Sequence, residues 1–446
     1  MILEKLFALK ESGTSLRREF VAGLTNFMTI SYIIFVQPSM LSLCGMDYGA
    51  VMVATCLSSA LATFCMAYFT NYPVVLAPGM GLNAYFVFDL CLGKGIPWQE
   101  ALGIVFIAGM LFFILSFVGI REAIMNALPH SLQNAIAIGI GLFIAFIGLQ
   151  WSGIITKDPA TFITRGALDT RPVLLSIFGI AVTLTLIARK VRGAILIGIL
   201  VSAVANLMIG TASYEGVVAA PPSIEPTLFK LQFPDIFAGL ETIQKLIPVI
   251  FVFFAIDMFD SIGTLTAIGY RAELMEEGKL AKARGALLTD AGSTVGGALL
   301  GTSTVTCFIE SATGITEGGR TGLTAAFTGI FMLLSVFLYP LVKIVGGGFQ
   351  ISQSAFLYPI IAPALIVVGG LMLRNVSQID WEDLTESIPA FLTMLMMPLS
   401  FSITDGIGFG FISLAFLKLV TGRRKEVHPV IYYFAFFFIA CYIGDL

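Results

Sequence analysis

Charged residues are scarce in this sequence. Only 12% of the 446 residues are Asp, Glu, Lys or Arg, whereas 57% are apolar, and the mean hydropathy is +0.93. One soluble core cannot bury that much apolar surface, so the composition excludes an ordinary soluble protein and indicates a polytopic membrane protein. No basic patch is present either, and we therefore expect no nucleic-acid partner.

Histidine and paired cysteine motifs are also nearly missing. The only histidines are His130 and His428, and the six cysteines form no CxxC or other metal-ligand spacing. The sequence contains no His–metal cluster, no activated Ser or Cys motif and no redox motif. It therefore predicts neither an enzyme nor a metal or cofactor site.

Long apolar runs are what the sequence has in abundance. A membrane-spanning helix needs about 20 apolar residues, and fourteen segments approach that length. These segments are 21–43, 49–69, 73–92, 98–119, 131–150, 172–188, 193–210, 246–268, 285–300, 302–317, 322–345, 355–373, 386–403 and 404–421. We expect an all-α polytopic fold of about fourteen spans, with 429–444 as a further span or an interfacial helix.

The spans are predicted to form two inverted repeats. The same offset takes Gln37 to Asp260 and Asn83 to Thr306, which gives units of seven spans. An odd number of spans per unit forces the two units into opposite orientations, as in many secondary transporters. The predicted organisation is a segment 1–20, a first repeat 21–210, an extracytoplasmic connection 211–245, a second repeat 246–421 and a C-terminal segment 422–446.

Lys and Arg give the expected orientation. With fourteen spans, most of the 25 basic residues fall on the same side as the N-terminus. Because cytoplasmic loops retain positive charge, we expect a multi-pass protein of the cell membrane with its N-terminus in the cytoplasm.

Three carboxylates lie inside apolar stretches. Asp257 and Asp260 belong to FVFFAIDMFDSIGTLTAIG, and Glu310 belongs to GTSTVTCFIESATGITEGG. A charged side chain at mid-membrane depth costs about 2.5–3.5 kcal/mol, so such groups usually face a watery cavity and handle a substrate, an ion or a proton. The two aspartates are three residues apart and can face one cavity, although both could instead be structural caps.

The third and tenth segments are interrupted. Pro78, Gly79 and Gly81 break the third, whereas Gly301 and the run 302–306 (TSTVT) favour extended chain in the tenth. Extended backbone at membrane depth must be enclosed by protein or line a cavity. We therefore expect two short strands that pair there and begin half-helices near Asn83 and Glu310. The alternative is a glycine-rich packing seam, for which Glu310 would have no use.

At these motifs the chain resembles a known family. VVLAPGMGLNAYF, FFAIDMFDSIGTLTAIG and TSTVTCFIESATGITEGGRTGLTA resemble the AzgA-like purine permeases of the nucleobase/cation symporter superfamily, over nearly the whole chain. The resemblance implies a core domain of spans 1–4 (to about 119) and 8–11 (246–345). It also implies a gate domain of spans 5–7 (131–210) and 12–14 (355–421).

The resemblance also implies an activity and its partners. These are uptake of adenine, guanine or hypoxanthine by alternating access, driven by proton symport. The expected partners are a purine nucleobase, a proton and membrane lipid, with a homodimer left open. The base preferred and the choice of H⁺ or Na⁺ stay open. In particular, Thr306-Cys307-Phe308 replaces a run that is richer in Thr and ends in Tyr in relatives.

Residue by residue, the family's binding positions fall on Asn83, Asp260 and Glu310, and Asp257 matches the first acid of its paired-acid motif. A flat purine edged with N–H donors and ring-nitrogen acceptors requires a carboxylate, an amide and apolar faces. The predicted substrate-binding set is Asn83, Asp260, Glu310, Phe86, Thr264, Phe259 and Phe308. Asp260 is the first choice for the proton, with Glu310 and Asp257 as the other candidates.

Other classes fit less well. A channel lacks its ring of acids or carbonyls. An anion exchanger of similar architecture would bring its substrate beside two or three acids that repel it. A xanthine or uracil symporter of the same superfamily is the nearest alternative.

Overall fold

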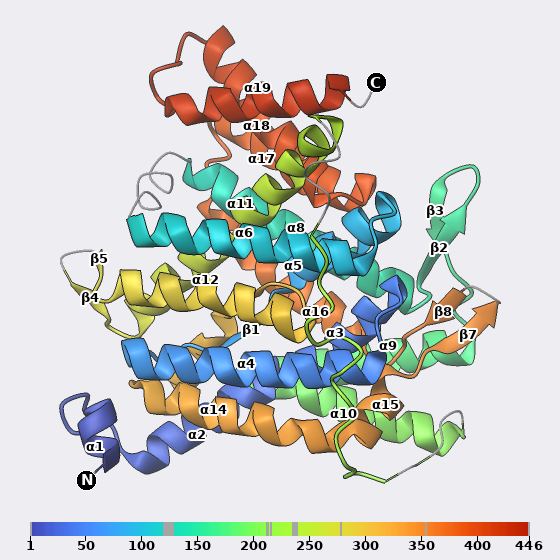
Figure 1. Cartoon of the computed structure of the whole chain (residues 1–446). Helices are drawn as coiled ribbons and strands as arrows, with labels where there is room; N and C mark the ends of the chain where they lie inside the picture. The colour runs from blue at the N-terminus through green and yellow to red at the C-terminus, as the bar shows by residue number, and fades with distance from the viewer. Residues whose placement is uncertain are drawn as a thin grey trace.

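The structure is a computed structural model that describes residues 2–118, 129–210, 214, 216–233, 240–276, 279–352 and 355–444. Helices make up most of it (Figure 1). Most of the predicted stretch between the fourth and fifth spans lies outside the described residues, as do 211–213, 215 and 234–239 of the connection 211–245.

The first half of the chain is mostly helical, with one short strand in the third predicted span and a hairpin described below. Its elements are α1 (Ile2–Phe7), α2 (Leu16–Ile30), α3 (Ile33–Leu41), a 3-10 turn (Ser42–Cys44), α4 (Tyr48–Thr70), β1 (Leu76–Pro78), α5 (Met80–Ala84), a π-helix (Tyr85–Gly93), α6 (Trp98–Val118), α8 (His130–Trp151), α9 (Arg171–Ala188) and α10 (Ala194–Ile209).

The second half has a strand at the corresponding place. Its elements are α11 (Leu240–Arg271), α12 (Ala283–Leu300), β6 (Val305–Cys307), a 3-10 turn (Ile309–Ser311), α13 (Ala312–Thr316), α14 (Gly322–Leu334), a 3-10 turn (Ser335–Leu338), α15 (Tyr339–Gly346), α16 (Ala362–Met372), a 3-10 turn (Leu373–Gln378), α17 (Leu384–Ser400), α18 (Ile403–Val420) and α19 (Pro429–Gly444).

Among the described residues, three hairpins lie at the ends of the helices. They are β2–β3 (Ile155–Asp158 and Phe162–Arg165), β4–β5 (Met275–Glu276 and Lys279–Leu280) and β7–β8 (Phe349–Ser352 and Ala355–Leu357). Figure 1 shows β2–β3 and β7–β8 at one end of the molecule, and β4–β5 with α1 at the other.

Helix ends follow local capping chemistry. The Ser15 side chain accepts from the N–H of Arg18, so α2 begins at Leu16, earlier than the predicted residue 21. The Asp47 side chain accepts from the N–H of Ala50 and begins α4, which Asn71 ends with a left-handed backbone at φ +60°.

A fully buried acid, Glu19, fixes the start of α14 from α2. Its carboxylate accepts from the hydroxyls of Thr321 (2.9 Å) and Thr324 (2.6 Å) and from the N–H of Thr324 (3.0 Å). A carboxylate is stabilised there because the N–H groups of the first helical turn are otherwise unpaired. This acid therefore joins two helices and has its acceptor sites filled.

The helices pack in two groups. The first bundle consists of α2–α6 and α11–α15 with β1 and β6, and the second bundle consists of α8–α10 and α16–α18. In the first bundle α4, α6, α12 and α14 lie side by side with nearly parallel axes (Figure 1). The C-terminal α19 packs on α18, and its Phe434 ring lies 4.6 Å from that of Phe251 in α11.

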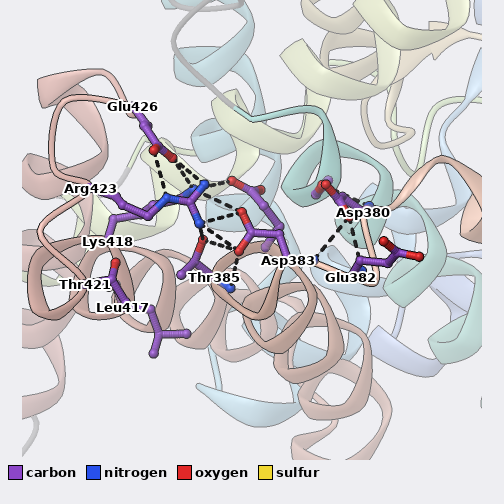
Figure 2. A network of polar contacts seen from close by, with 11 residues as sticks. Asp380, Glu382, Asp383, Thr385, Leu417, Lys418, Thr421, Arg423 and Glu426 are labelled. Carbon is purple, nitrogen blue, oxygen red and sulfur yellow. Dashed lines mark hydrogen bonds and ion pairs between the residues drawn. The ribbon is translucent and has the colours of Figure 1, made fainter.

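An ion-pair network joins α17, α18 and the loop that follows α18. The Lys418 ammonium, 2% exposed, lies 3.0 Å from both Glu386 and Glu426, and Arg423 lies 2.8 Å from Asp383 and 2.7 Å from Glu426. Figure 2 shows these side chains converging from the start of α17, the end of α18 and the following loop. A lysine this buried is stable only with such partners.

The protein is a multi-pass membrane protein. By length and composition, eight helices among the described residues can cross a membrane, and Met80–Gly93, Ala194–Ile209 and Pro429–Ile443 are shorter apolar helices. Each predicted span coincides with helix or, in the third, tenth and twelfth, with strand and helix. The count of fourteen spans, their inverted repeat, and the roles of the bundles as core and gate domains stay predictions.

Candidate functional site

The site is built on the antiparallel pair β1–β6, which joins the two halves of the chain. Leu76 pairs with Cys307, Ala77 with Thr306 and Pro78 with Val305. The N–H of Phe308 donates to the carbonyl of Val75 (2.9 Å) and that of Gly79 to the carbonyl of Thr304 (3.0 Å). The predicted strand pairing is confirmed. It satisfies the backbone of both interrupted spans where water is absent.

Asn83 lies in the half-helix after β1, α5, and is fully buried. Its amide nitrogen donates to the Gln37 side-chain oxygen, and its oxygen accepts from the Ser303 hydroxyl. Gln37 in turn donates to Thr302 (2.9 Å) and Ser303 (3.2 Å). Asn83 therefore fastens the strand crossing to α3. To contact a substrate, the Asn83 amide would have to exchange its bond to Gln37 or to Ser303. The substrate-binding role of Asn83 stays a prediction.

The paired aspartates of α11 face different surroundings. Asp257 is 2% exposed and accepts from the Thr294 hydroxyl of α12 at 3.2 Å. Asp260 has an exposed side chain, and its charge interacts with those of Asp290 and Glu310. Asp257 is therefore part of the packing between α11 and α12, whereas Asp260 faces accessible space beside the tenth predicted span.

Glu310 begins the half-helix after β6 and is partly accessible. The hydroxyl of the buried Tyr32 in α3's N-cap position donates to its carboxylate at 3.5 Å, at the edge of hydrogen-bond range. Neighbouring Ile309 is 42% exposed. An acceptor carboxylate and an apolar side chain are therefore accessible together at this turn.

A fourth acid, Asp290 in α12, joins the site, and sequence reasoning missed it. It is fully buried and accepts from the Ser261 hydroxyl (2.5 Å) and the N–H of Cys307 (3.0 Å). Ser261 also contacts the Thr306 hydroxyl at 2.8 Å. Asp290 thus ties α11 and α12 to β6. The signal was available, because this acid also lies inside an apolar segment, 285–300.

The remaining predicted residues are placed less directly. Phe86 on the π-helix is fully buried, Phe308 is 6% exposed, and both pack in the main apolar core. Thr264 in α11 is 6% exposed. The side chain of Phe259 lies outside the described residues. Stacking or hydrogen bonding by these four residues stays a prediction.

The arrangement suits recognition of N–H donors or a proton. Asp260 and Glu310 are accessible carboxylates close enough for their charges to interact, and Ile309 supplies an apolar surface beside them. Among the described residues, no group of three or more His, Cys, Asp or Glu side chains is arranged to hold a metal ion. Acids at a break in a membrane helix are typical of a membrane transporter.

The chain belongs to the Permease family, whose model matches residues 17–409. It is 43% identical to the guanine/hypoxanthine permease PbuG of Bacillus subtilis, over 99% of both chains. It is 41% identical to the adenine permease AdeP of Escherichia coli, over 98% of this chain and 95% of that protein. The resemblance to the AzgA-like purine permeases is confirmed. Because permeases are transporters, the protein is not an enzyme.

A solved structure has the same fold at low identity. The transmembrane domain of the cyanobacterial bicarbonate transporter BicA matches with a TM-score of 0.63 and 13% identity, over 87% of this chain and 97% of that one. At this identity the likeness concerns the fold alone.

Proposed function

We propose that the protein imports purine nucleobases, adenine, guanine or hypoxanthine, by proton symport and alternating access across the cell membrane, with its N-terminus in the cytoplasm. Relatives at 43% and 41% identity named guanine/hypoxanthine and adenine permeases support nucleobase transport. The observation that carries the proposal furthest is the accessible pair Asp260 and Glu310 beside the strand crossing.

Glu310 is the proposed anchor for the base. A purine presents N–H groups along its edge, and a carboxylate accepts two of them with stronger bonds than a neutral acceptor makes. Its place directly after β6 holds the carboxylate against the strand pair, and Ile309 contacts the flat face of the base. Backbone N–H groups at the half-helix starts complete the recognition of the ring nitrogens.

Asp260 is the proposed proton carrier, with Glu310 and Asp257 as the other candidates. Its charge interacts with those of Asp290 and Glu310, so three negative charges lie near one another. Binding a proton relieves the repulsion among them. In the proposed cycle, base and proton bind from outside, the neutral site crosses between states, and loss of the proton inside releases the base.

The bundles are the proposed moving parts, the first as core domain and the second as gate domain. Several contacts join them, and two polar ones lie on opposite sides of the membrane in the predicted topology. The Ser402 hydroxyl donates to Asp89 at 2.8 Å, and the Arg192 guanidinium lies 2.6 Å from Glu317. The predicted topology places the first contact near the outside and the second near the inside. Alternating access then requires the two contacts to break in turn.

Uptake into proteoliposomes tests the function. Radiolabelled adenine, guanine, hypoxanthine, xanthine and uracil are each supplied with an inward proton gradient, and again after an ionophore collapses it. The expected result is gradient-dependent uptake of one or more of the first three. Preferred uptake of xanthine or uracil would assign the alternative, and no uptake of any base by folded protein would remove the nucleobase proposal.

A further inference from the structure

A cleft of about 340 Å³ lies between the two bundles, away from the substrate site. Ser15, Arg17, Arg18, Val21 and Glu317 line it from the first bundle, and Arg192, in the loop between α9 and α10, lines it from the second. All six residues belong to helix ends or the loops beside them. The cleft is therefore at the edge of the membrane-spanning region, on the predicted cytoplasmic side.

Positive charge in the cleft exceeds negative charge. Arg192 is paired with Glu317 at 2.6 Å, which leaves the charges of Arg17 and Arg18 uncompensated there. Both of these side chains are exposed, and neither guanidinium makes a hydrogen bond or ion pair with the described residues. Two free arginines beside a third present planar forks of N–H donors, which match the oxygens of a phosphate.

Apolar side chains continue from the cleft along α2. Leu16 and Phe20 are 50% and 43% exposed, and they occupy positions next to Arg17 and Val21 in the first turns of a helix that can cross a membrane. The Phe20 ring packs edge-on against Phe327 of α14 at 5.2 Å. A phosphate bound by the arginines would therefore have an apolar wall beside it on the membrane side.

We propose that this cleft binds the phosphate headgroup of an anionic phospholipid, with the acyl chains along Leu16 and Phe20. Basic pockets between membrane helices on the cytoplasmic side take such headgroups. Arg17 and Arg18 hold the phosphate. Because Arg192 lies in the same cleft, the headgroup competes with Glu317 for it and weakens one contact between the bundles.

Lipid binding by the full-length protein tests the proposal independently of transport. Purified protein is placed in nanodiscs of phosphatidylcholine with or without phosphatidylglycerol, and retained lipid is measured by native mass spectrometry. The Arg17→Gln/Arg18→Gln double variant is expected to lose about thirtyfold in preference for phosphatidylglycerol, since each of the two arginines contributes about 1 kcal/mol near an anionic surface and tenfold corresponds to about 1.4 kcal/mol. Arg424→Gln/Lys425→Gln is the matched control, because it removes two exposed charges outside the cleft.

A second variant separates the cleft from general surface charge. Glu317→Gln frees Arg192, so phosphatidylglycerol retention is expected to equal or exceed that of the unmodified protein. Thermal unfolding confirms that each variant is folded. Equal losses in both double variants, or displacement of the lipid by inorganic phosphate as readily as by soluble phosphatidylglycerol, would overturn the proposal.

Discussion

The two interrupted spans begin alike and then diverge. Each supplies one strand of the β1–β6 pair, and each then turns into a short helix. After β1, Asn83 is fully buried with both ends of its amide bonded to protein, whereas after β6, Glu310 is partly accessible and only loosely bonded to Tyr32. The third predicted span therefore stabilises the strand pair through Asn83, and the tenth presents Glu310 to a ligand.

The strongest test of this contrast is Glu310→Gln. The substitution keeps the size of the side chain but removes the charge and one acceptor. If Glu310 anchors the base, uptake is expected to fall about a hundredfold or more, because a polar site is left mismatched to its substrate. The measurement is initial uptake rate in proteoliposomes, with unfolding temperature as the control. An uptake rate close to that of the unmodified protein would remove Glu310 from the site.

Asp260→Asn distinguishes proton coupling from base binding. Unlike the carboxylate, the amide cannot bind and release a proton. We therefore expect uptake that equilibrates the base across the membrane but no longer accumulates it against a gradient. Counterflow of labelled base reports binding and exchange separately. If the variant still accumulates the base against a gradient, the proton carrier is Glu310 or Asp257 and not Asp260.

Asn83→Ala tests the stabilising role of the third predicted span. Losing the amide removes the donor to the Gln37 side-chain oxygen and the acceptor of the Ser303 hydroxyl, which costs about 1–3 kcal/mol of stability. A double-mutant cycle with Gln37→Ala is expected to be non-additive, because both residues belong to one network. Additive effects, or a loss of base binding at unchanged unfolding temperature, would instead make Asn83 a ligand.

Asp290→Asn applies the same distinction, between a structural and a ligand-binding polar group, to a buried acid. The amide keeps one acceptor and cannot satisfy both the Ser261 hydroxyl and the N–H of Cys307. We expect a loss of about 1–3 kcal/mol in stability. Unfolding monitored in detergent checks this, with Asp169→Asn as a matched control at an exposed position before α9. Unchanged stability would indicate that Asp290 is not a structural acceptor.

The smallest expected effect is on the pH dependence of stability. It concerns the ion-pair network of Figure 2, which belongs to neither interrupted span. Hydrogen bonds from Thr385 and Arg423 lower the pKa of Asp383 to about 2. A carboxyl with a lowered pKa stabilises the folded protein above its unfolded pKa, and this contribution is lost as the pH falls from about 4 to about 2. Asp383→Asn is expected to flatten the fall in unfolding temperature over that range slightly. An unchanged profile would mean that the network does not stabilise the fold.

Much of the fold followed from local patterns in the sequence. The apolar runs located the helices, and the combination of Pro78, Gly79 and a Thr-rich run located the strands and their pairing. Helix starts were less accurate: α2 begins at Leu16 because Ser15 caps it, a side-chain contact that hydropathy ignores.

The site was predicted in part. An acid inside an apolar run is visible in sequence, and Asp260 and Glu310 do lie near each other. Asp290 met the same criterion and was missed. The partners of Asn83 could not be foreseen, because Ser303 is 220 residues away in sequence and Gln37 is 46, and only tertiary packing brings them together.

The β1–β6 pair also constrains how the protein is made. When the ribosome has delivered the first half of the chain to the membrane, β1 has no partner until Val305–Cys307 arrives. Its N–H and C=O groups cannot stay without hydrogen-bond partners in the hydrocarbon of the membrane. The third span therefore has to stay near the membrane interface, or enclosed by other protein, until then. The first half of this protein therefore reaches its final fold late in biogenesis, when the second half has been inserted and β1 can pair with β6.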